Sequence, residues 1–138
     1  MLSEKEAIQF INIETDTVWK ELSKIYNLSD LKKPEIIIEL KYSRTAGSAY
    51  YTMKKVSFNL RLCMIEGKGF YRTICHELAH IVQFYIYPHA KQGHGPEFRN
   101  IMFCLDQDGA TYHSYNVKAA KSLSIKSLLI DTISIDEM

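Results

Sequence analysis

The chain lacks the features of secreted and membrane-spanning proteins. Its first residues, Met1 to Glu6, include two acids where a secretory signal would carry bases. No uninterrupted apolar run reaches the length that spans a bilayer. The three cysteines, Cys63, Cys75 and Cys104, are far apart and form no C-x-x-C pair, which argues against a disulfide framework and a zinc ribbon. We therefore expect a cytoplasmic protein without a membrane segment, whose thiols are buried.

The composition is typical of a single folded domain. Hydrophobic residues make up 46% of the chain and charged residues 24%, proportions that disordered and fibrous proteins do not share. A chain of 138 residues is long enough to bury one core but not two. No internal repeat or linker divides it, so we predict one domain over residues 1–138.

Hydrophobic patterning predicts a helix followed by a small sheet. A capping box at Ser3 and apolar residues at three- and four-residue steps predict a helix over 4–26. A β-branched run predicts a strand over 36–40, and alternating polarity predicts another from Val56 to Arg61. Turn-forming residues between the two strands indicate a hairpin. We expect about three strands, mostly antiparallel.

Two helices should follow the sheet. The segment Glu66-Gly67-Lys68-Gly69 breaks the strand pattern, and the next helix is expected from Phe70 to Tyr87. Pro96 suits a first helical position, so another helix should begin there. The residues expected on its core face are Phe98, Ile101, Met102 and Leu105. Weaker signals beyond this helix indicate a strand over 111–115 and a helix over 117–129.

The motif that carries chemistry is His76-Glu77-Leu78-Ala79-His80. Two histidines four residues apart lie one turn apart on the same face of a helix, so both can bind one metal ion. Glu77 projects about 100° around the helix axis from His76. From there its carboxylate can reach a metal-activated water without being a ligand. The motif predicts zinc ligands at His76 and His80 and a catalytic carboxylate at Glu77.

The surrounding helix supports the metal site. Apolar and aromatic side chains gather on the side opposite the two histidines, so that one face packs and the other can coordinate. The packing residues are Tyr71, Ile74, Leu78, Ile81, Val82 and Tyr85. This amphipathic context is what distinguishes a metal-binding H-E-x-x-H motif from a chance match.

A catalytic zinc needs a third protein ligand and an open position for water. The candidates are His89, His94, His113 and Glu97. A metzincin is excluded, because Gln83 and Ile86 stand where that family has its glycine and third histidine. A tight loop after Pro88 could return His94 to the metal. His89 follows the helix end too closely to reach back and is expected to be an exposed loop residue.

The H-E-x-x-H motif together with His94-Gly95-Pro96-Glu97-Phe98 resembles the SprT-like metalloprotease family, which includes the Spartan-like proteases. The strand before the motif is also similar, so the resemblance covers a core of residues 34–105, with 106–138 as a C-terminal segment.

The resemblance implies a zincin-like α+β fold, in which an N-terminal helix and a small sheet precede the H-E-x-x-H helix and a following helix. It further implies one catalytic zinc bound by His76, His80 and His94, with Glu77 as the catalytic carboxylate. The H-E-x-x-H motif alone gives the same roles to His76, Glu77 and His80, and the loop after Pro88 favours His94 as the third ligand.

The resemblance also implies a substrate class. Spartan-like members cleave proteins crosslinked to DNA and are activated by DNA, especially where single strands are exposed. Many members carry a zinc ribbon or separate DNA-binding segments after the protease core, and this sequence shows neither. We expect protein or peptide substrates, single-stranded DNA as a partner, and no obligate protein partner.

The charge distribution offers another route to DNA. Residues 31–75 hold nine Lys/Arg against three Asp/Glu, a net +6, whereas 1–30 and 76–138 carry −3 and −2. Basic and aromatic side chains alternate there and could contact phosphates and stack on bases; alternatively, the aromatic ones only pack in the sheet. The basic residues are Lys41, Arg44, Lys54, Lys55, Arg61, Lys68 and Arg72, and the aromatic ones are Tyr42, Tyr50, Tyr51 and Phe58.

The predicted activity is zinc-dependent peptide hydrolysis, in which Glu77 takes a proton from water and passes it to the leaving amine. A donor to the oxyanion is also expected, with Tyr71, Tyr112 and His113 as candidates. Two alternatives stay open. One is a zinc-stabilised DNA-binding or adaptor module, although Cys75 projects toward the packed side and is poorly placed as a fourth ligand. The other is a peptidase without a connection to DNA.

Overall fold

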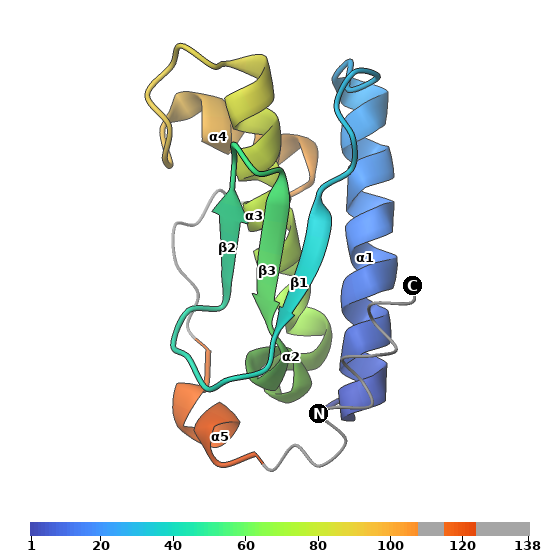
Figure 1. The fold of residues 1–138 in the computed structure, drawn as a ribbon, viewed down its shortest axis with the longest axis vertical. Helices are drawn as coiled ribbons and strands as arrows, with labels where there is room; N and C mark the ends of the chain where they lie inside the picture. The colour runs from blue at the N-terminus through green and yellow to red at the C-terminus, as the bar shows by residue number, and fades with distance from the viewer. Residues whose placement is uncertain (108–114, 124–138) are drawn as a thin grey trace.

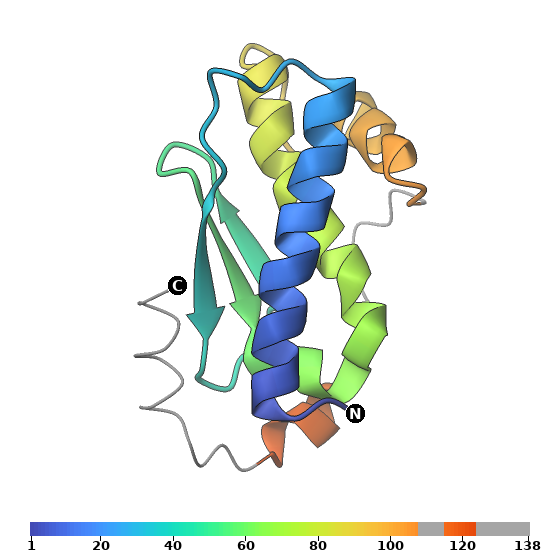
Figure 2. The same cartoon turned by 90° about the vertical axis from the view of Figure 1, so that its right-hand side faces the viewer.

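A computed structural model shows a three-stranded sheet with helices packed on one of its faces (Figure 1, Figure 2). The structure describes residues 1–107 and 115–123. The predicted α+β class is confirmed, with one helix before the sheet and the H-E-x-x-H helix and a further helix after it. In chain order the elements are α1 (Glu4–Ile25), β1 (Glu35–Glu39), β2 (Gly47–Tyr50), β3 (Lys55–Asn59), α2 (Leu60–Glu66), the 3-10 turn η1 (Gly67–Phe70), α3 (Tyr71–Ile86), α4 (Pro96–Cys104) and α5 (Val117–Lys121).

The first helix begins as its sequence predicts. The backbone N–H of Glu6 donates to the Ser3 hydroxyl at 3.1 Å, and the backbone N–H of Ser3 donates to the Glu6 carboxylate at 3.0 Å. This reciprocal capping box satisfies donors that a helix start leaves unpaired. One stripe of α1 is buried against α2 and α3, with Ile11 and Leu22 fully buried.

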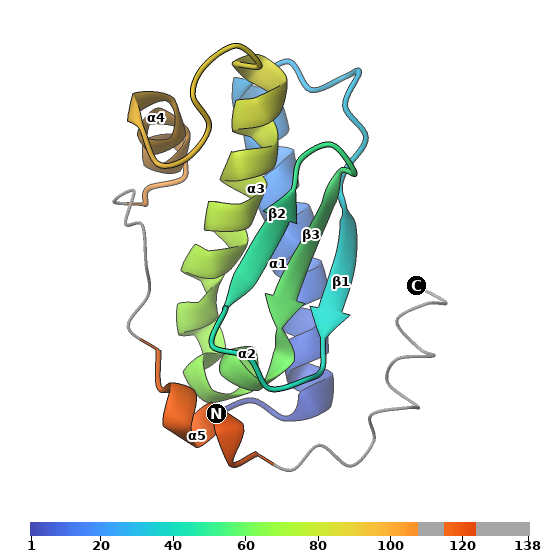
Figure 3. The ribbon, with the colours of Figure 1, turned by 60° about the vertical axis from the view of Figure 1, so that its left-hand side comes forward.

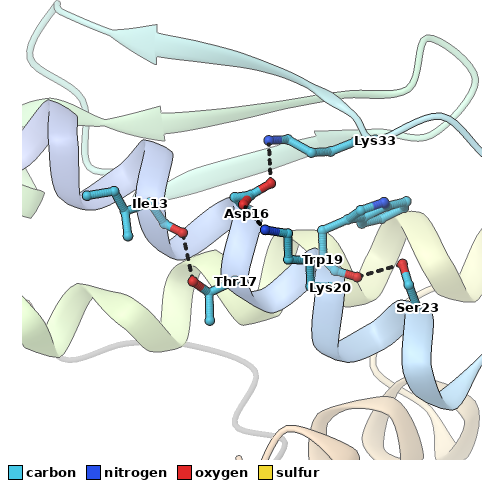
Figure 4. Close-up of polar contacts among 7 residues, drawn as sticks. All are labelled: Ile13, Asp16, Thr17, Trp19, Lys20, Ser23 and Lys33. Carbon is cyan, nitrogen blue, oxygen red and sulfur yellow. Dashed lines mark hydrogen bonds and ion pairs between the residues drawn. The ribbon is translucent and has the colours of Figure 1, made fainter.

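Polar contacts also join α1 to the loop that leads into β1 (Figure 4). The Asp16 carboxylate pairs with Lys20 at 3.0 Å and with Lys33 of that loop at 3.4 Å. The hydroxyls of Thr17 and Ser23 donate to backbone carbonyls one turn earlier. Exposed ion pairs of this kind contribute only about 0–1 kcal/mol. The position of α1 therefore depends mainly on its buried apolar stripe.

The sheet has the predicted three strands, but it is mixed. β3 is central, with β1 parallel on one side and β2 antiparallel on the other. The expected mostly antiparallel sheet is wrong for β1, because the chain after β1 passes around the end of β3 before β2 begins (Figure 3). A tight turn over 51–54 then joins β2 to β3, with Lys54 at a positive φ of 53°.

A helix begins where the alternating pattern predicts further strand. Strand β3 ends at Asn59, and α2 starts at Leu60. The Asn59 side-chain oxygen accepts a hydrogen bond from the Leu62 N–H at 3.1 Å, which caps the helix. α2 ends at Gly67, whose φ of 58° favours glycine. The capping role of Asn59 is hidden in the sequence, because the same residue also fits the polar face of a strand.

Helix α3 is buried on nearly every side. Its predicted core residues Ile74 and Leu78 are fully buried, and α1 packs against this side of the molecule. The opposite side lies against β2 and α4 (Figure 3), so that the polar residues His76, Glu77 and His80 are buried too. The H-E-x-x-H motif therefore lies between layers of the fold.

Other sequence expectations have mixed outcomes. The predicted core face of α4 is buried at all four positions.

Cys63 and Cys75 are buried, but Cys104, at the last residue of α4, is exposed, so the expectation of buried thiols is wrong there. The predicted helix over 117–129 begins as α5 but ends at Lys121, because Ser122 and Leu123 are not helical. Its part beyond residue 123 lies outside the described residues, as does most of the predicted strand over 111–115. Within the described ranges, no helix has the length and apolar character of a membrane span.

Asn59 also holds the loop between β1 and β2. Its amide donates to the backbone carbonyls of Ser43 at 2.8 Å and Thr45 at 3.1 Å, while its oxygen caps α2. Since Asn59 is only 1% exposed, Asn59→Ala should leave three backbone groups without their partner and lower the free energy of unfolding by about 2–3 kcal/mol. Chemical denaturation followed by circular dichroism measures the change. The exposed Asn100→Ala is the control and should change stability by less than about 0.5 kcal/mol.

Candidate metal centre

Three imidazoles converge at one point beside α3. His76 and His80 lie one turn apart on α3, and His94 comes from the loop between α3 and α4. The three Nε2 atoms form a nearly equilateral triangle, with separations of 3.2 Å between His76 and His80, 3.1 Å between His80 and His94, and 3.1 Å between His94 and His76. These are the three residues that the two sequence motifs single out.

Mutual hydrogen bonds cannot explain this triangle. A neutral imidazole nitrogen either donates or accepts, so three Nε2 atoms cannot all be bonded to one another. One metal ion satisfies all three lone pairs together. Zinc–nitrogen bonds of about 2.0–2.1 Å in a tetrahedral site place the ligand nitrogens roughly 3.3–3.4 Å apart, which is close to the separations observed. The histidine group can hold a metal ion.

Burial favours the protonation state that a metal needs. Metal-binding imidazoles must be neutral. Burial, together with the nearby His94, lowers the pKa of His80 to about 4, although the Gln83 side chain acts in the opposite direction. Burial also lowers the pKa of His94. Both rings therefore keep a free lone pair at neutral pH.

A compact loop presents His94. The Gln92 side-chain amide donates to the backbone carbonyls of Tyr87 and Ala90, each at 3.0 Å. The next residue, Gly93, has a φ of 125°, a conformation that other residues rarely adopt. These features turn the chain back after α3, as the sequence predicts for His94, and α4 then starts at Pro96.

The ring of Phe98 packs against all three histidine rings. This fully buried residue of α4 has its ring centroid 4.9 Å from His76, 4.5 Å from His80 and 4.9 Å from His94. The sequence identifies Phe98 as a core residue but does not show that its ring contacts all three histidines. Its packing limits how far any ligand ring can turn.

Glu77 follows His76 on α3 and is buried beside β2. It is 7% exposed, and burial raises the pKa of its carboxyl to about 8. No hydrogen bond or ion pair of this carboxylate is found within residues 1–107 and 115–123. A positive charge at the histidine triangle would lower the pKa again. Glu77 is therefore a buried carboxyl group whose ionisation depends on what the site contains.

Gly47 of β2 allows Glu77 to lie where it does. A Cβ atom at Gly47 would lie 2.9 Å from the Glu77 Cγ, 2.9 Å from the Ser57 carbonyl oxygen and 3.1 Å from the Thr73 Cγ2. Distances this short do not occur without a shift of the backbone. The sequence places Gly47 among turn formers, and its contact with α3 depends on strand packing that no local pattern reveals.

Tyr115 packs against the first turn of α3. The Tyr115 hydroxyl lies 2.7 Å from the Thr73 hydroxyl, and the Arg72 guanidinium lies over the Tyr115 ring at 4.8 Å from its centroid. The Tyr115 ring also stacks on Phe70, with 5.9 Å between the ring centroids. Arg72, one of the predicted phosphate contacts, is thus engaged by Tyr115.

The remaining candidates for the site do not join it. His89 is exposed in the loop after α3, as expected. Glu97 lies in the first turn of α4 and is not part of the histidine group. Tyr71 contacts Cys75, and its pKa is raised by burial, by Cys75 and by the acids of α1, so it faces away from the histidines. Tyr112 and His113 lie outside the described residues.

Gly47→Ala tests the packing of β2 on α3. The added methyl group must push the strand and the helix apart, and we expect a loss of about 1–3 kcal/mol of unfolding free energy, as overpacked sites show. Thermal and chemical denaturation of the metal-free protein measure it. Gly69→Ala is the matched control, because a Cβ atom at Gly69 would meet nothing within 4 Å. Equal stability of the two variants would contradict the close contact.

Comparison with known proteins agrees with this geometry. The family model of the SprT-like family matches residues 15–119, which is most of the chain. A search of curated proteins and a search of solved structures each find no match. The matched range contains all three histidines of the metal centre, Glu77 and Gly47. The chain belongs to the SprT-like family.

Proposed function

We propose that this protein is a zinc-dependent endopeptidase that acts on proteins bound or crosslinked to DNA in the cytoplasm. The observation that carries the enzymatic part is the convergence of three imidazole Nε2 atoms next to the buried carboxyl group of Glu77. Membership of the SprT-like family supports it, because that family is associated with metallopeptidase activity.

His76, His80 and His94 would hold the zinc ion. A zinc ion held there would lower the pKa of a water molecule and polarise a substrate carbonyl group. Glu77 would accept the proton of the attacking water. The same carboxyl group then donates the proton to the amine nitrogen as the peptide C–N bond breaks. Its buried position suits a group that must both take and return a proton.

The ligand count favours catalysis over a structural role. Structural zinc sites usually have four protein ligands, whereas catalytic sites keep one position open. Among the described residues, only the three histidines form the group. The neighbouring Cys75 is buried on the side of α3 that carries Tyr71 and is not part of the histidine group. The adaptor-module alternative is therefore the weaker one.

The edge strand β2 suits an extended polypeptide substrate. β2 pairs only with β3 among the strands that the structure describes, and it lies against α3 close to Glu77. The free edge of a strand presents backbone groups that can pair with another chain. A substrate segment paired with β2 would bring its backbone carbonyl groups alongside the metal centre, whatever its side chains are.

Single substitutions separate metal binding from catalysis. Glu77→Gln should keep one equivalent of zinc and lose proteolysis by about 10²-fold or more, because the amide cannot accept the proton. His94→Ala should lose both zinc and activity. Zinc content is measured by elemental analysis and cleavage by a fluorogenic unfolded-protein substrate. His89→Ala, an exposed histidine five residues before His94, is the matched control and should retain both.

Two outcomes would contradict the enzymatic proposal. Full cleavage by Glu77→Gln would remove Glu77 from the mechanism. A zinc-loaded wild-type protein that cleaves no substrate, with or without DNA, would favour the adaptor alternative.

A basic groove supports the DNA part of the proposal. It has a volume of about 430 Å³ and lies between the loop after β1 and α5. Three of its residues are cationic and none is acidic. The lining residues are Tyr42, Arg44, Val117, Lys118 and Lys121. The Lys121 ammonium group lies 5.6 Å from the centroid of the Tyr42 ring. Cations beside an exposed aromatic ring are the features that bind phosphates and stack on bases.

The predicted basic stretch does not act as one surface. Phe58 is fully buried in the sheet, so it cannot stack on a base. Lys54 lies near Lys32 and Lys33 at the start of β1, at the other end of the sheet from Arg44. Only Tyr42 and Arg44 of the predicted stretch contribute to the groove, and α5 supplies the other two cations.

The triple variant Arg44→Gln, Lys118→Gln, Lys121→Gln tests the groove. If the groove binds single-stranded DNA, this variant should bind a labelled oligonucleotide at least 10-fold more weakly, with a salt slope smaller by about 2, since each lost phosphate contact removes roughly 0.7. The matched control is Lys32→Gln, Lys33→Gln, Lys54→Gln, which removes the same charge at the other end of the sheet.

Wild-type cleavage of a DNA-binding substrate should rise with single-stranded DNA; equal cleavage with and without it would remove DNA as an activator.

A further inference from the structure

Tyr51 is held at the end of β2 by a well-anchored turn. Its backbone carbonyl accepts a hydrogen bond from the Lys54 N–H at 3.3 Å, and the Lys54 carbonyl accepts one from the Glu35 N–H at 3.0 Å. The turn between β2 and β3 is thereby tied to the start of β1. Tyr51 follows directly on the edge strand along which a substrate would pair.

Aromatic contacts place the Tyr51 ring at the metal centre. The ring stacks on Phe84 with 5.5 Å between the centroids and an interplanar angle of 14°. Phe84 lies one turn beyond His80 on the ligand face of α3. The Tyr51 ring centroid is also 6.0 Å from that of His80. Tyr51 and Phe84 thus form a wall of the site, while Phe98 packs against the histidine rings.

The Tyr51 hydroxyl remains available as a donor. Tyr51 is partly buried, and its hydroxyl lies within electrostatic range of the Glu77 carboxylate. No hydrogen bond of this hydroxyl is found to any part of the chain that the structure describes. A half-buried hydroxyl of this kind can donate to a bound ligand.

Tyr71, a candidate from the sequence, and Tyr115 are engaged elsewhere. Tyr71 faces Cys75 and the acids of α1. The Tyr115 hydroxyl lies 2.7 Å from that of Thr73. Of the tyrosines in the described part of the chain, Tyr51 is the one with ring contact to a metal-site histidine.

We propose that Tyr51 is a catalytic residue whose hydroxyl donates a hydrogen bond to the oxyanion of the tetrahedral intermediate. The inference rests on the proposed endopeptidase function. As the water oxygen bonds to the carbonyl carbon, the carbonyl π electrons move to its oxygen, and the water proton goes to Glu77. The Tyr51 hydroxyl keeps its own proton and donates a hydrogen bond that strengthens as charge develops. When the C–N bond breaks, the carbonyl re-forms and this hydrogen bond weakens.

Tyr51→Phe tests the proposal, because it removes the hydroxyl and keeps the stacking on Phe84. We expect kcat to fall by about 10²-fold, with KM changed less than about 2-fold and one equivalent of zinc retained. Affinity for a phosphinic peptide, whose tetrahedral phosphinyl group mimics the intermediate, should fall by a similar factor, whereas affinity for the cleaved product peptide should not change. Tyr26→Phe is the control and should leave all five quantities unchanged, since Tyr26 lies at the end of α1 with its hydroxyl near Cys104.

The outcomes distinguish this inference from the function on which it rests. An active wild type with unchanged kcat and phosphinic-peptide affinity in Tyr51→Phe would overturn the role of Tyr51 and leave the endopeptidase proposal standing. Loss of zinc from Tyr51→Phe would also overturn it, because the residue would then support the ligands. A zinc-loaded wild type without any cleavage would overturn the endopeptidase proposal itself.

Discussion

The close approach of β2 to α3 is the contact on which the metal centre depends. At Gly47 the strand backbone lies so near the helix that a single methyl group would overlap with Glu77, Thr73 and the neighbouring strand. This contact covers the side of α3 that carries the polar motif. Without this contact Glu77 would face solvent, and burial would no longer raise the pKa of its carboxyl group.

Burial of the motif has an energetic cost that a bound metal offsets. Burial keeps His80 neutral and disfavours an ionised Glu77, so the metal-free protein holds polar groups in surroundings that do not stabilise their charge. A cation at the histidine triangle restores a favourable environment for the carboxylate and engages all three imidazoles. Binding of a metal ion at the histidine triangle would therefore be coupled to folding. The ring of Phe98 already restricts the three imidazoles. They would therefore lose less side-chain conformational entropy when an ion binds.

The two proposed activities are located at different ends of the fold. The histidine group comes from α3 and the loop before α4, with β2 packed beside α3. The basic groove is lined by residues of the loop after β1 and of α5, two segments that lie together at one end of the sheet (Figure 1). A nucleic acid in the groove would leave the free edge of β2 open to a polypeptide. This arrangement suits a protease whose substrate is attached to DNA, because the two ligands do not compete for one surface.

Local signals in the sequence predicted much of the fold and most of the metal centre. The capping box of α1, the periodicity of α3 and the Pro96 start of α4 each depend on residues within a few positions of one another, and each was confirmed. The four-residue spacing of His76 and His80 places both on one helix face, and the motif around His94 indicated the third member of the histidine group. Such features follow from helix geometry alone.

Other features depended on contacts between distant segments. The parallel pairing of β1 with β3 and the placement of Arg44 beside Lys118 and Lys121 join parts of the chain that no local pattern relates. The same holds for the approach of Gly47 and Tyr51 to the motif. The sequence by itself thus determined which residues can bind the metal, because one helical turn sets their spacing. Only the tertiary structure decided what surrounds them, because burial and neighbouring charge arise where separate elements pack together.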